Sequence, residues 1–224
     1  VDKRGFVVYC RLRYHHAATS CNLFARALTP HYRRAVRGVI CVDKLLGNGL
    51  FTLFYVHHVV AEKLADALGI TIDKDYSSVT SDVPFYGVYY GQSALPLPAD
   101  TLIYLTNETL AGCRVYDYET DSYIPVYDTD LLGGKDPYQA FLSGSKSLLR
   151  IENPAATNDR ELILFRDSFG SSLAPLLASG YAKITLVDIR YISPNLLGRF
   201  VDFGGKDVLF LYSTSVLNSS ELLK

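Results

Sequence analysis

The chain has 224 residues, of which 49% are hydrophobic and 20% are charged, enough to bury the core of one globular domain. Its formal net charge of -1 gives no electrostatic attraction for nucleic acid or for an anionic membrane surface, so we expect neither as a partner. The four cysteines show no metal-binding spacing, and buried thiols or a disulfide remain as alternatives.

Two short strands and one long helix are predicted in the first 70 residues. Apolar runs predict the strands at 5–10 and 36–42. Residues 54–68 carry apolar side chains at helical spacing, and Gly69 ends this helix.

Two adjacent histidines, His57 and His58, fall on the first turns of this helix. A histidine in such a place is more often an ordinary polar-face residue than a catalyst. Metal ligands on a helix lie on one face of it, whereas two adjacent residues point in different directions. We therefore expect no metal and no other cofactor.

A tyrosine-rich segment follows at residues 71–140. Its alternating stretches 101–105 and 113–118 predict antiparallel strands joined by polar turns. We therefore expect a β-rich insertion that covers one end of the core. Its tyrosines suit stacking against carbohydrate, although β propensity alone also accounts for them.

From residue 148 onward the pattern becomes α/β. Strands are predicted near 148–152, 161–166, 184–187 and 207–211, with helices after Ser168 and around 194–203. Apolar runs of this length separated by helices predict a mostly parallel sheet buried on both faces, in three layers. We expect residues 1–70 and 140–224 to build this core together, as a single domain with the 71–140 insertion.

Ser168 stands where the strand at 161–166 stops and a helix begins. The carboxyl end of a strand is where open α/β sheets bind ligands, and the N–H groups of the next helix start can hold an oxyanion. This is how a serine hydrolase or acyltransferase presents its nucleophile. The alternative is that Asp167 and Ser168 only cap the helix.

An ordered series of short motifs runs through the later part of the chain. They are Tyr86-Gly87, Leu95-Pro96-Leu97-Pro98, residues 138–144, 150–154 and 167–170, and the segments 184–191 and 207–212. Over residues 62–224, this series resembles the DHHW family, a bacterial group within the SGNH-hydrolase-like superfamily that is related to alginate O-acetyltransferases. The resemblance implies an SGNH-hydrolase-like core and an extracytoplasmic protein, secreted or attached to the bacterial surface by an N-terminal membrane anchor that has been removed.

The chain departs from that family at the motif that gives it its name. In the related acetyltransferases an Asp-His-His-Trp motif supplies the Asp and His of a Ser-His-Asp triad, and it is expected here near residues 49–52, where it is absent. Either the triad is degenerate, or a stretch of the natural sequence is absent from this chain. The lack of Met and Trp favours the second explanation.

A serine hydroxyl needs a base to take its proton, and every histidine of the chain precedes Ser168. The common SGNH order, with Asp and His after the serine, is therefore excluded, and only the permuted order is compatible with a histidine-assisted mechanism. Ser168 is the predicted nucleophile, with His58 or His57 as the base.

The resemblance also indicates the groups around the nucleophile. It points to the N–H groups of Ser168 and Gly144 as oxyanion donors, with Ser145 where the family has Asn, and Arg190 is expected to pair with Asp188 near the same sheet edge. The implied function is that of a serine esterase or O-acyltransferase acting on a cell-envelope or exported glycan, with a carbohydrate or acylated glycan as substrate. The rival hypothesis is a non-catalytic glycan-binding or scaffold protein with a degenerate triad.

Overall fold

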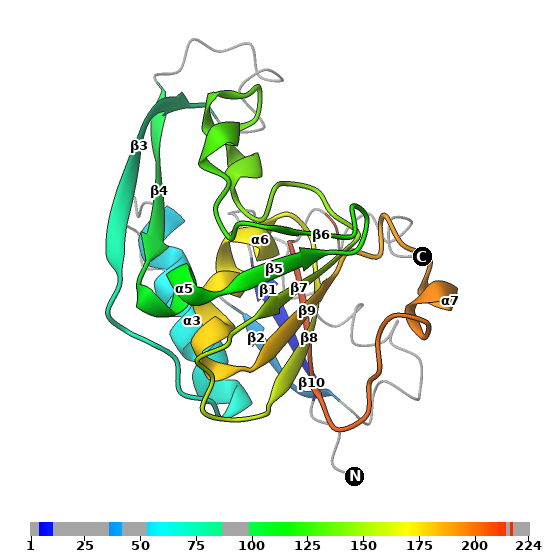
Figure 1. Cartoon of the computed structure of the whole chain (residues 1–224). Helices are drawn as coiled ribbons and strands as arrows, with labels where there is room; N and C mark the ends of the chain where they lie inside the picture. Colours follow the sequence, from blue (N-terminus) through cyan, green and yellow to red (C-terminus); the bar gives the residue numbers. More distant parts are fainter. Residues whose placement is uncertain (1–4, 11–35, 42–52, 87–98, 214–215, 217–224) are drawn as a thin grey trace.

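A computed structural model of the chain describes residues 5–10, 36–41, 53–86, 99–213 and 216 (Figure 1). The expected motif position at 49–52, His15, His16 and His31 lie outside these residues. The side chain of His57 is likewise not described.

One eight-stranded sheet forms the centre of the molecule, in the order β2-β1-β10-β8-β9-β7-β5-β6. Its strands are β1 (Gly5–Cys10), β2 (Val36–Cys41), β5 (Arg114–Asp117), β6 (Ser122–Ile124), β7 (Leu148–Glu152), β8 (Glu161–Arg166), β9 (Lys183–Val187) and β10 (Asp207–Ser213). Because β1 pairs with β10 and β10 pairs with β8, the two ends of the chain share one sheet, as predicted.

The sheet is mixed, and this corrects the expectation of a mostly parallel one. The strands β2, β1, β10, β8 and β9 run parallel to one another, whereas the pairs β9–β7, β7–β5 and β5–β6 are antiparallel. A short polar turn joins β5 to β6 and permits only antiparallel pairing, since a parallel crossover needs a dozen or more residues.

The tyrosine-rich segment divides between two sheets. A separate antiparallel pair is formed by β3 (Ser77–Phe85) and β4 (Asp100–Thr106), while β5 and β6 complete one edge of the main sheet. In Figure 1 the β3–β4 pair stands beside the main sheet, over α3. The segment thus extends the core as well as covering it.

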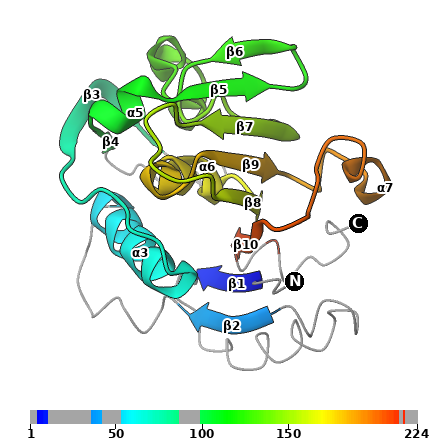
Figure 2. The same cartoon turned by 60° about the horizontal axis from the view of Figure 1, so that its bottom comes forward.

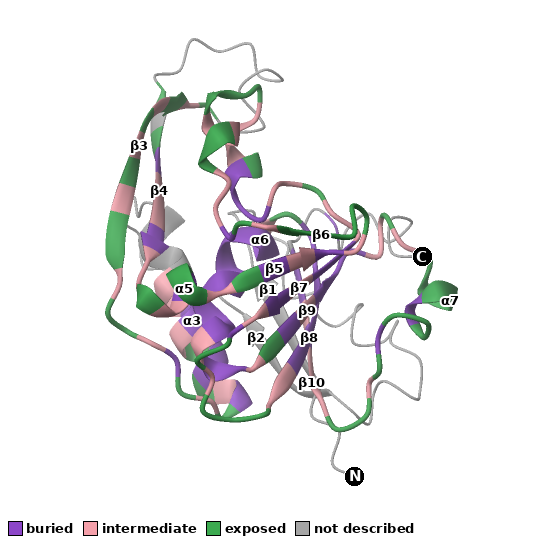
Figure 3. Cartoon of the chain, in the orientation of Figure 1, coloured by how far each residue is buried: buried purple, intermediate pink, exposed green. Residues whose placement is uncertain are grey.

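Helices pack mainly on one face of the sheet. This face carries α3 (Leu53–Leu68) and α6 (Phe169–Leu173), the latter continuing into the 3-10 helix η4 (Ala174–Gly180) (Figure 2). Their buried residues meet those of the central strands in one apolar cluster, which Figure 3 shows as the buried centre of the molecule. Pro175 lies at the start of η4 and lacks the N–H that a continuing α-helix needs there.

The other face is covered by α7 (Pro194–Leu197) and irregular chain, whose Leu197 and Val201 pack on Ile163 and Phe165. The helix expected over 194–203 is therefore only one turn long, and it ends at Leu197, after which the chain forms turns. A full third layer is not established by the residues described. None of the helices in the described part is long and apolar enough to cross a membrane.

Candidate active site

Ser168 lies at the predicted place. The central strand β8 ends at Arg166, the buried Asp167 follows, and Ser168 is exposed immediately before α6. The geometry of this turn therefore confirms an accessible serine at the carboxyl end of a central strand.

The Ser168 side chain does not cap the helix. Its backbone is already in the right-handed helical region (φ -58°, ψ -30°), and its hydroxyl makes no capping hydrogen bond. Asp167 caps the helix instead, because its Oδ1 accepts a hydrogen bond from the N–H of Phe169 at 3.0 Å. The capping interpretation thus describes Asp167 and leaves the Ser168 hydroxyl available for other chemistry.

A close approach between Gly170 and Arg166 fixes the shape of this turn. A Cβ placed on Gly170 would lie 2.5 Å from the Cβ of Arg166, nearer than two such atoms can come. Glycine at position 170 therefore lets the helix start directly after the strand end, where Ser168 is exposed.

Several buried charges lie at this same edge of the sheet. Since β9 is parallel to β8, the ends of both strands meet there, and Asp188 follows β9. Arg190 binds this fully buried carboxylate through two hydrogen bonds, of 2.8 Å from Nε and 2.6 Å from Nη2. The buried Arg166 approaches it to 3.8 Å. The expected pairing of Asp188 with Arg190 is confirmed, and it ties down the chain beside Ser168.

The carboxyl end of β5 adds a second buried carboxylate, Asp117, to this edge. Lys146 lies 2.9 Å from it, and the carbonyl oxygen of Lys146 accepts a hydrogen bond of 3.4 Å from Arg166. Burial alone would raise the pKa of Asp117, but its hydrogen bonds with Lys146, with the Glu119 N–H and with Thr120 outweigh burial and lower the pKa. The loop at 144–147 therefore links the ends of β5 and β8.

Tyr138 contacts Ser168 from the preceding segment. It lies in the 3-10 helix η3 (Pro137–Ala140), and its hydroxyl donates to the carbonyl oxygen of Ser168 at 3.2 Å while lying 2.8 Å from the Ser172 hydroxyl. Burial raises the pKa of Tyr138 to about 12. Tyr138 belongs to the motif at residues 138–144, which is visible in the sequence. Its contact with Ser168 joins residues 30 positions apart, and no local sequence pattern predicts such a contact.

Two buried polar atoms at these strand ends have no hydrogen-bond partner among the described residues, namely Nε of Arg166 and the hydroxyl of Tyr212. Tyr212 belongs to β10, which pairs with β8. An unpaired buried polar group costs roughly 1–3 kcal/mol. The end of the sheet therefore carries an unfavourable arrangement of the kind that concentrates at functional sites.

The proposed bases are placed on α3. The Nε2 of His58 lies 3.3 Å from the carbonyl oxygen of Lys74, its Nδ1 lies 3.9 Å from Glu62, and its ring meets that of Tyr76 edge to face. Ser168 is not among these contacts. His57 precedes it on the same helix.

The loop with the second proposed oxyanion donor is a tight turn. Gly144 has φ +87°, and its N–H donates to the carbonyl oxygen of Phe141 at 3.2 Å. This positive φ favours glycine. For Gly144 to bind an oxyanion, this turn hydrogen bond must first be released, whereas Ser145 beside it is exposed.

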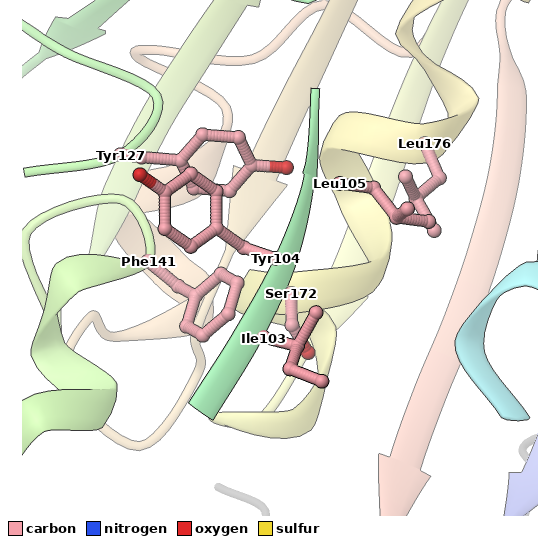
Figure 4. Close-up of a pocket in the computed structure, with 7 residues that line it drawn as sticks. All are labelled: Ile103, Tyr104, Leu105, Tyr127, Phe141, Ser172 and Leu176. Atoms are coloured by element: carbon pink, nitrogen blue, oxygen red, sulfur yellow. The ribbon is translucent and has the colours of Figure 1, made fainter. Parts of the chain in front are cut away.

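A small pocket of about 20 Å³ lies between β4, the residue that follows η3 and the helix that follows Ser168 (Figure 4). It is lined by Ile103, Tyr104, Leu105, Tyr127, Phe141, Ser172 and Leu176. This volume holds about one water molecule. Through Ser172 and Tyr138 the pocket adjoins the back of the candidate site.

Comparison with known proteins identifies similar folds. No protein-family model matches the chain, and no curated protein matches it. A DHHW family protein from Eubacterium siraeum, known from a crystal structure, superimposes with a TM-score of 0.69 at 18% identity, covering 100% of this chain and 82% of that one. PatB1 from Bacillus cereus gives a TM-score of 0.67 in two structures, one carrying a sulfonyl adduct, at 16% and 15% identity. These cover 96% of this chain and 82% and 83% of those chains. At this level of identity the comparison shows that the chain shares its fold with a DHHW family protein and with PatB1.

Proposed function

We propose that the protein is an extracytoplasmic serine esterase or O-acyltransferase that acts on a cell-envelope or exported glycan, with Ser168 as nucleophile. The observation that carries the proposal is the exposed Ser168 hydroxyl, which makes no capping bond at the carboxyl end of a central strand. The fold shared with PatB1, whose structure carries a sulfonyl adduct in one form, supports an O-acetyltransferase-like protein.

In the proposed reaction a histidine removes the Ser168 proton as Oγ attacks the carbonyl carbon of an acyl ester. The negative charge that develops on the carbonyl oxygen is stabilised by the Ser168 N–H, and by Gly144 once its turn opens. Collapse of this tetrahedral species breaks the ester bond, and the histidinium protonates the departing alkoxide. Water or a glycan hydroxyl then takes the acyl group from Ser168.

The first prediction concerns Ser168→Ala. Loss of the nucleophile should reduce turnover of 4-nitrophenyl acetate by about 10⁴-fold or to background, because no other group replaces Oγ. Stability should change by less than about 0.5 kcal/mol, since the side chain is exposed and caps nothing. Ester hydrolysis and urea unfolding are measured on the same preparations.

Ser193→Ala is the matched control. Ser193 is also exposed, also precedes a helix and also makes no capping hydrogen bond, so this variant should keep wild-type turnover. Equal turnover by wild type and Ser168→Ala would reject the nucleophile. His57→Ala and His58→Ala then identify the base, because only the variant without the base should lose turnover.

The second candidate function is a glycan-binding or scaffold protein with a degenerate triad. The contact between His58 and the carbonyl oxygen of Lys74 favours it, since this ring nitrogen is engaged away from Ser168. Wild-type protein that binds glycan and hydrolyses no ester would select this candidate.

A further inference from the structure

Arg166 places a buried guanidinium at the end of β8, two residues before Ser168. Its side chain is only 1% exposed, and burial lowers its pKa. A buried charge is costly unless close partners compensate it. The partners of Arg166 therefore show what its burial achieves.

The contacts of Arg166 are long for a structural ion pair. Its Nη1 lies 3.8 Å from Oδ2 of Asp188 and 3.5 Å from the carbonyl oxygen of Asp167. Its Nη2 lies 3.4 Å from the carbonyl oxygen of Lys146, whereas ordinary N–H···O bonds measure about 2.7–3.2 Å. Its Nε has no hydrogen-bond partner among the described residues. Stability alone therefore does not explain a charge at this position.

Asp188 does not depend on Arg166 for its pairing. Arg190 already binds this carboxylate through hydrogen bonds of 2.8 Å and 2.6 Å. An apolar side chain of similar length would fill the place of Arg166 at a lower cost in free energy. Poorly paired buried charge is typical of functional sites.

The contact with the Asp167 carbonyl acts on the Ser168 N–H, because both belong to the same peptide group. This carbonyl oxygen accepts from the N–H of Gly170 at 3.0 Å and from Nη1 of Arg166. The two donors fix the orientation of the peptide plane. The positive charge also draws electron density away from the N–H end, because hydrogen-bonded groups polarise one another. The first proposed oxyanion donor is thereby oriented and strengthened.

The contact with the Lys146 carbonyl reaches the loop at 144–147, which carries the second proposed donor, Gly144. On its other side this loop is held by the Ser147 N–H, which donates to Oε1 of Glu119 at 2.8 Å. The two nitrogens of Arg166 that make these contacts belong to one rigid, planar guanidinium. They therefore fix the spacing between the loop and the end of β8.

We propose that Arg166 is a positioning residue for the reaction at Ser168. Its guanidinium holds the Asp167–Ser168 peptide in one orientation and keeps the 144–147 loop beside it. Donors that are oriented before the reaction stabilise the developing negative charge without reorganisation. This role rests on the proposed function, because it requires an oxyanion to form at Ser168.

Arg166→Met tests this role, because Met is similar in length and carries no charge. We expect kcat for 4-nitrophenyl acetate to fall by about 10²-fold, as on loss of one oxyanion donor. KM should stay within about twofold, since the lost interaction is made in the transition state. The urea midpoint of unfolding should equal or exceed that of wild type, because a poorly paired buried charge is removed. A structural role would lower both kcat and the midpoint.

Arg160→Met is the matched control, because Arg160 lies directly before β8, at the other end of the same strand. Its guanidinium also contacts two carbonyl oxygens and one carboxylate, but at short distances. These are 2.8 Å to Gly69, 2.9 Å to Leu68 and 2.6 Å to Asp207. Arg160→Met should therefore lower the urea midpoint and leave kcat of the folded protein unchanged, which is the opposite pattern.

Arg166→Gln is a second variant that replaces Arg166→Met if circular dichroism shows the Met variant to be unfolded. The Gln amide can donate to only one of the two carbonyl oxygens. We therefore expect kcat to fall by about tenfold or more, although less than in Arg166→Met.

Wild-type kcat in either folded Arg166 variant would overturn the positioning role and leave Ser168 as the nucleophile. A loss of kcat together with a lower urea midpoint in both variants would also overturn it, because both effects would then follow from a structural role. If wild type itself hydrolyses no ester, the proposed function fails, and the role of Arg166 fails with it.

Discussion

Asp188 shows at the scale of one residue how the candidate site is held. Its carboxylate is fully buried, and Arg190 supplies two side-chain hydrogen bonds and one from its backbone N–H. Arg166 is more distant, at 3.8 Å. A buried carboxylate in this arrangement depends on its partner, because desolvation of the charge is costly unless it is paired.

Arg190→Ala should therefore lower the free energy of unfolding by about 3 kcal/mol, since it leaves a buried charge poorly paired. Lys183→Ala is the control. Lys183 forms an exposed pair with Glu161, so its loss should cost less than about 1 kcal/mol. Urea unfolding of both variants gives the comparison, and equal losses would contradict the structural role of the Asp188–Arg190 pair.

At the scale of one element, the turn between β8 and α6 depends on Gly170. In Gly170→Ala the new methyl group would overlap the Arg166 side chain, which is itself buried. We expect a loss of about 1–3 kcal/mol from overpacking, together with lower ester turnover because Ser168 is displaced.

Gly198→Ala tests the same exchange where space is available. No atom lies within 4 Å of a Cβ at this position, and its φ of -62° suits any residue. This variant should be as stable as wild type or slightly more stable. Thermal unfolding of Gly170→Ala and Gly198→Ala compares the two positions. A Gly170→Ala variant as stable as wild type would refute the close approach to Arg166.

The elements differ in how far the sequence predicts them. The strands β7, β8 and β9 and the helix α3 are long apolar patterns bounded by clear breaks, and the structure confirms them within one or two residues. The sheet to which β5 and β6 belong could not be predicted. The same alternation of apolar and polar residues occurs in a separate hairpin and at the edge of a larger sheet. The length of α7 was overestimated, because the helical spacing of Leu197 and Val201 continues in the sequence, whereas the chain forms turns from Gly198 onward.

The features of the candidate site also differ in how far the sequence predicts them. Ser168 and the Asp188–Arg190 pair follow from the ends of apolar runs and from spacing along the chain. The contacts of Tyr138 with Ser168 and of Lys146 with Asp117 join segments that are distant in sequence. Such contacts depend on the packed fold, and no local sequence pattern predicts them.

At the scale of the whole molecule, buried tyrosines make stability depend on alkaline pH. Burial raises the pKa of Tyr76 and of Tyr138 from 10.0 to about 12. Above pH 10 the unfolded chain loses these protons before the folded protein does, so stability is complete below pH 10 and falls as pH rises toward 12.

We expect the free energy of unfolding to fall by ~2 kcal/mol or more across this range, measured by urea denaturation at pH 8 to 11.5. Tyr138→Phe removes one of the titrating groups and should give a shallower decline. A decline as steep as that of wild type would exclude Tyr138 as a contributor.

The most direct measurement of the central claim is covalent labelling of the full chain with phenylmethanesulfonyl fluoride, followed by tryptic digestion and mass spectrometry. An activated Ser168 Oγ forms a bond to sulfur, its proton passes to the base, and fluoride leaves. We predict one sulfonyl adduct on Ser168, within the peptide 167–183, and none in Ser168→Ala or on the matched Ser193. Absence of the adduct, or equal labelling of Ser168 and Ser193, would contradict the assignment of Ser168 as an activated nucleophile.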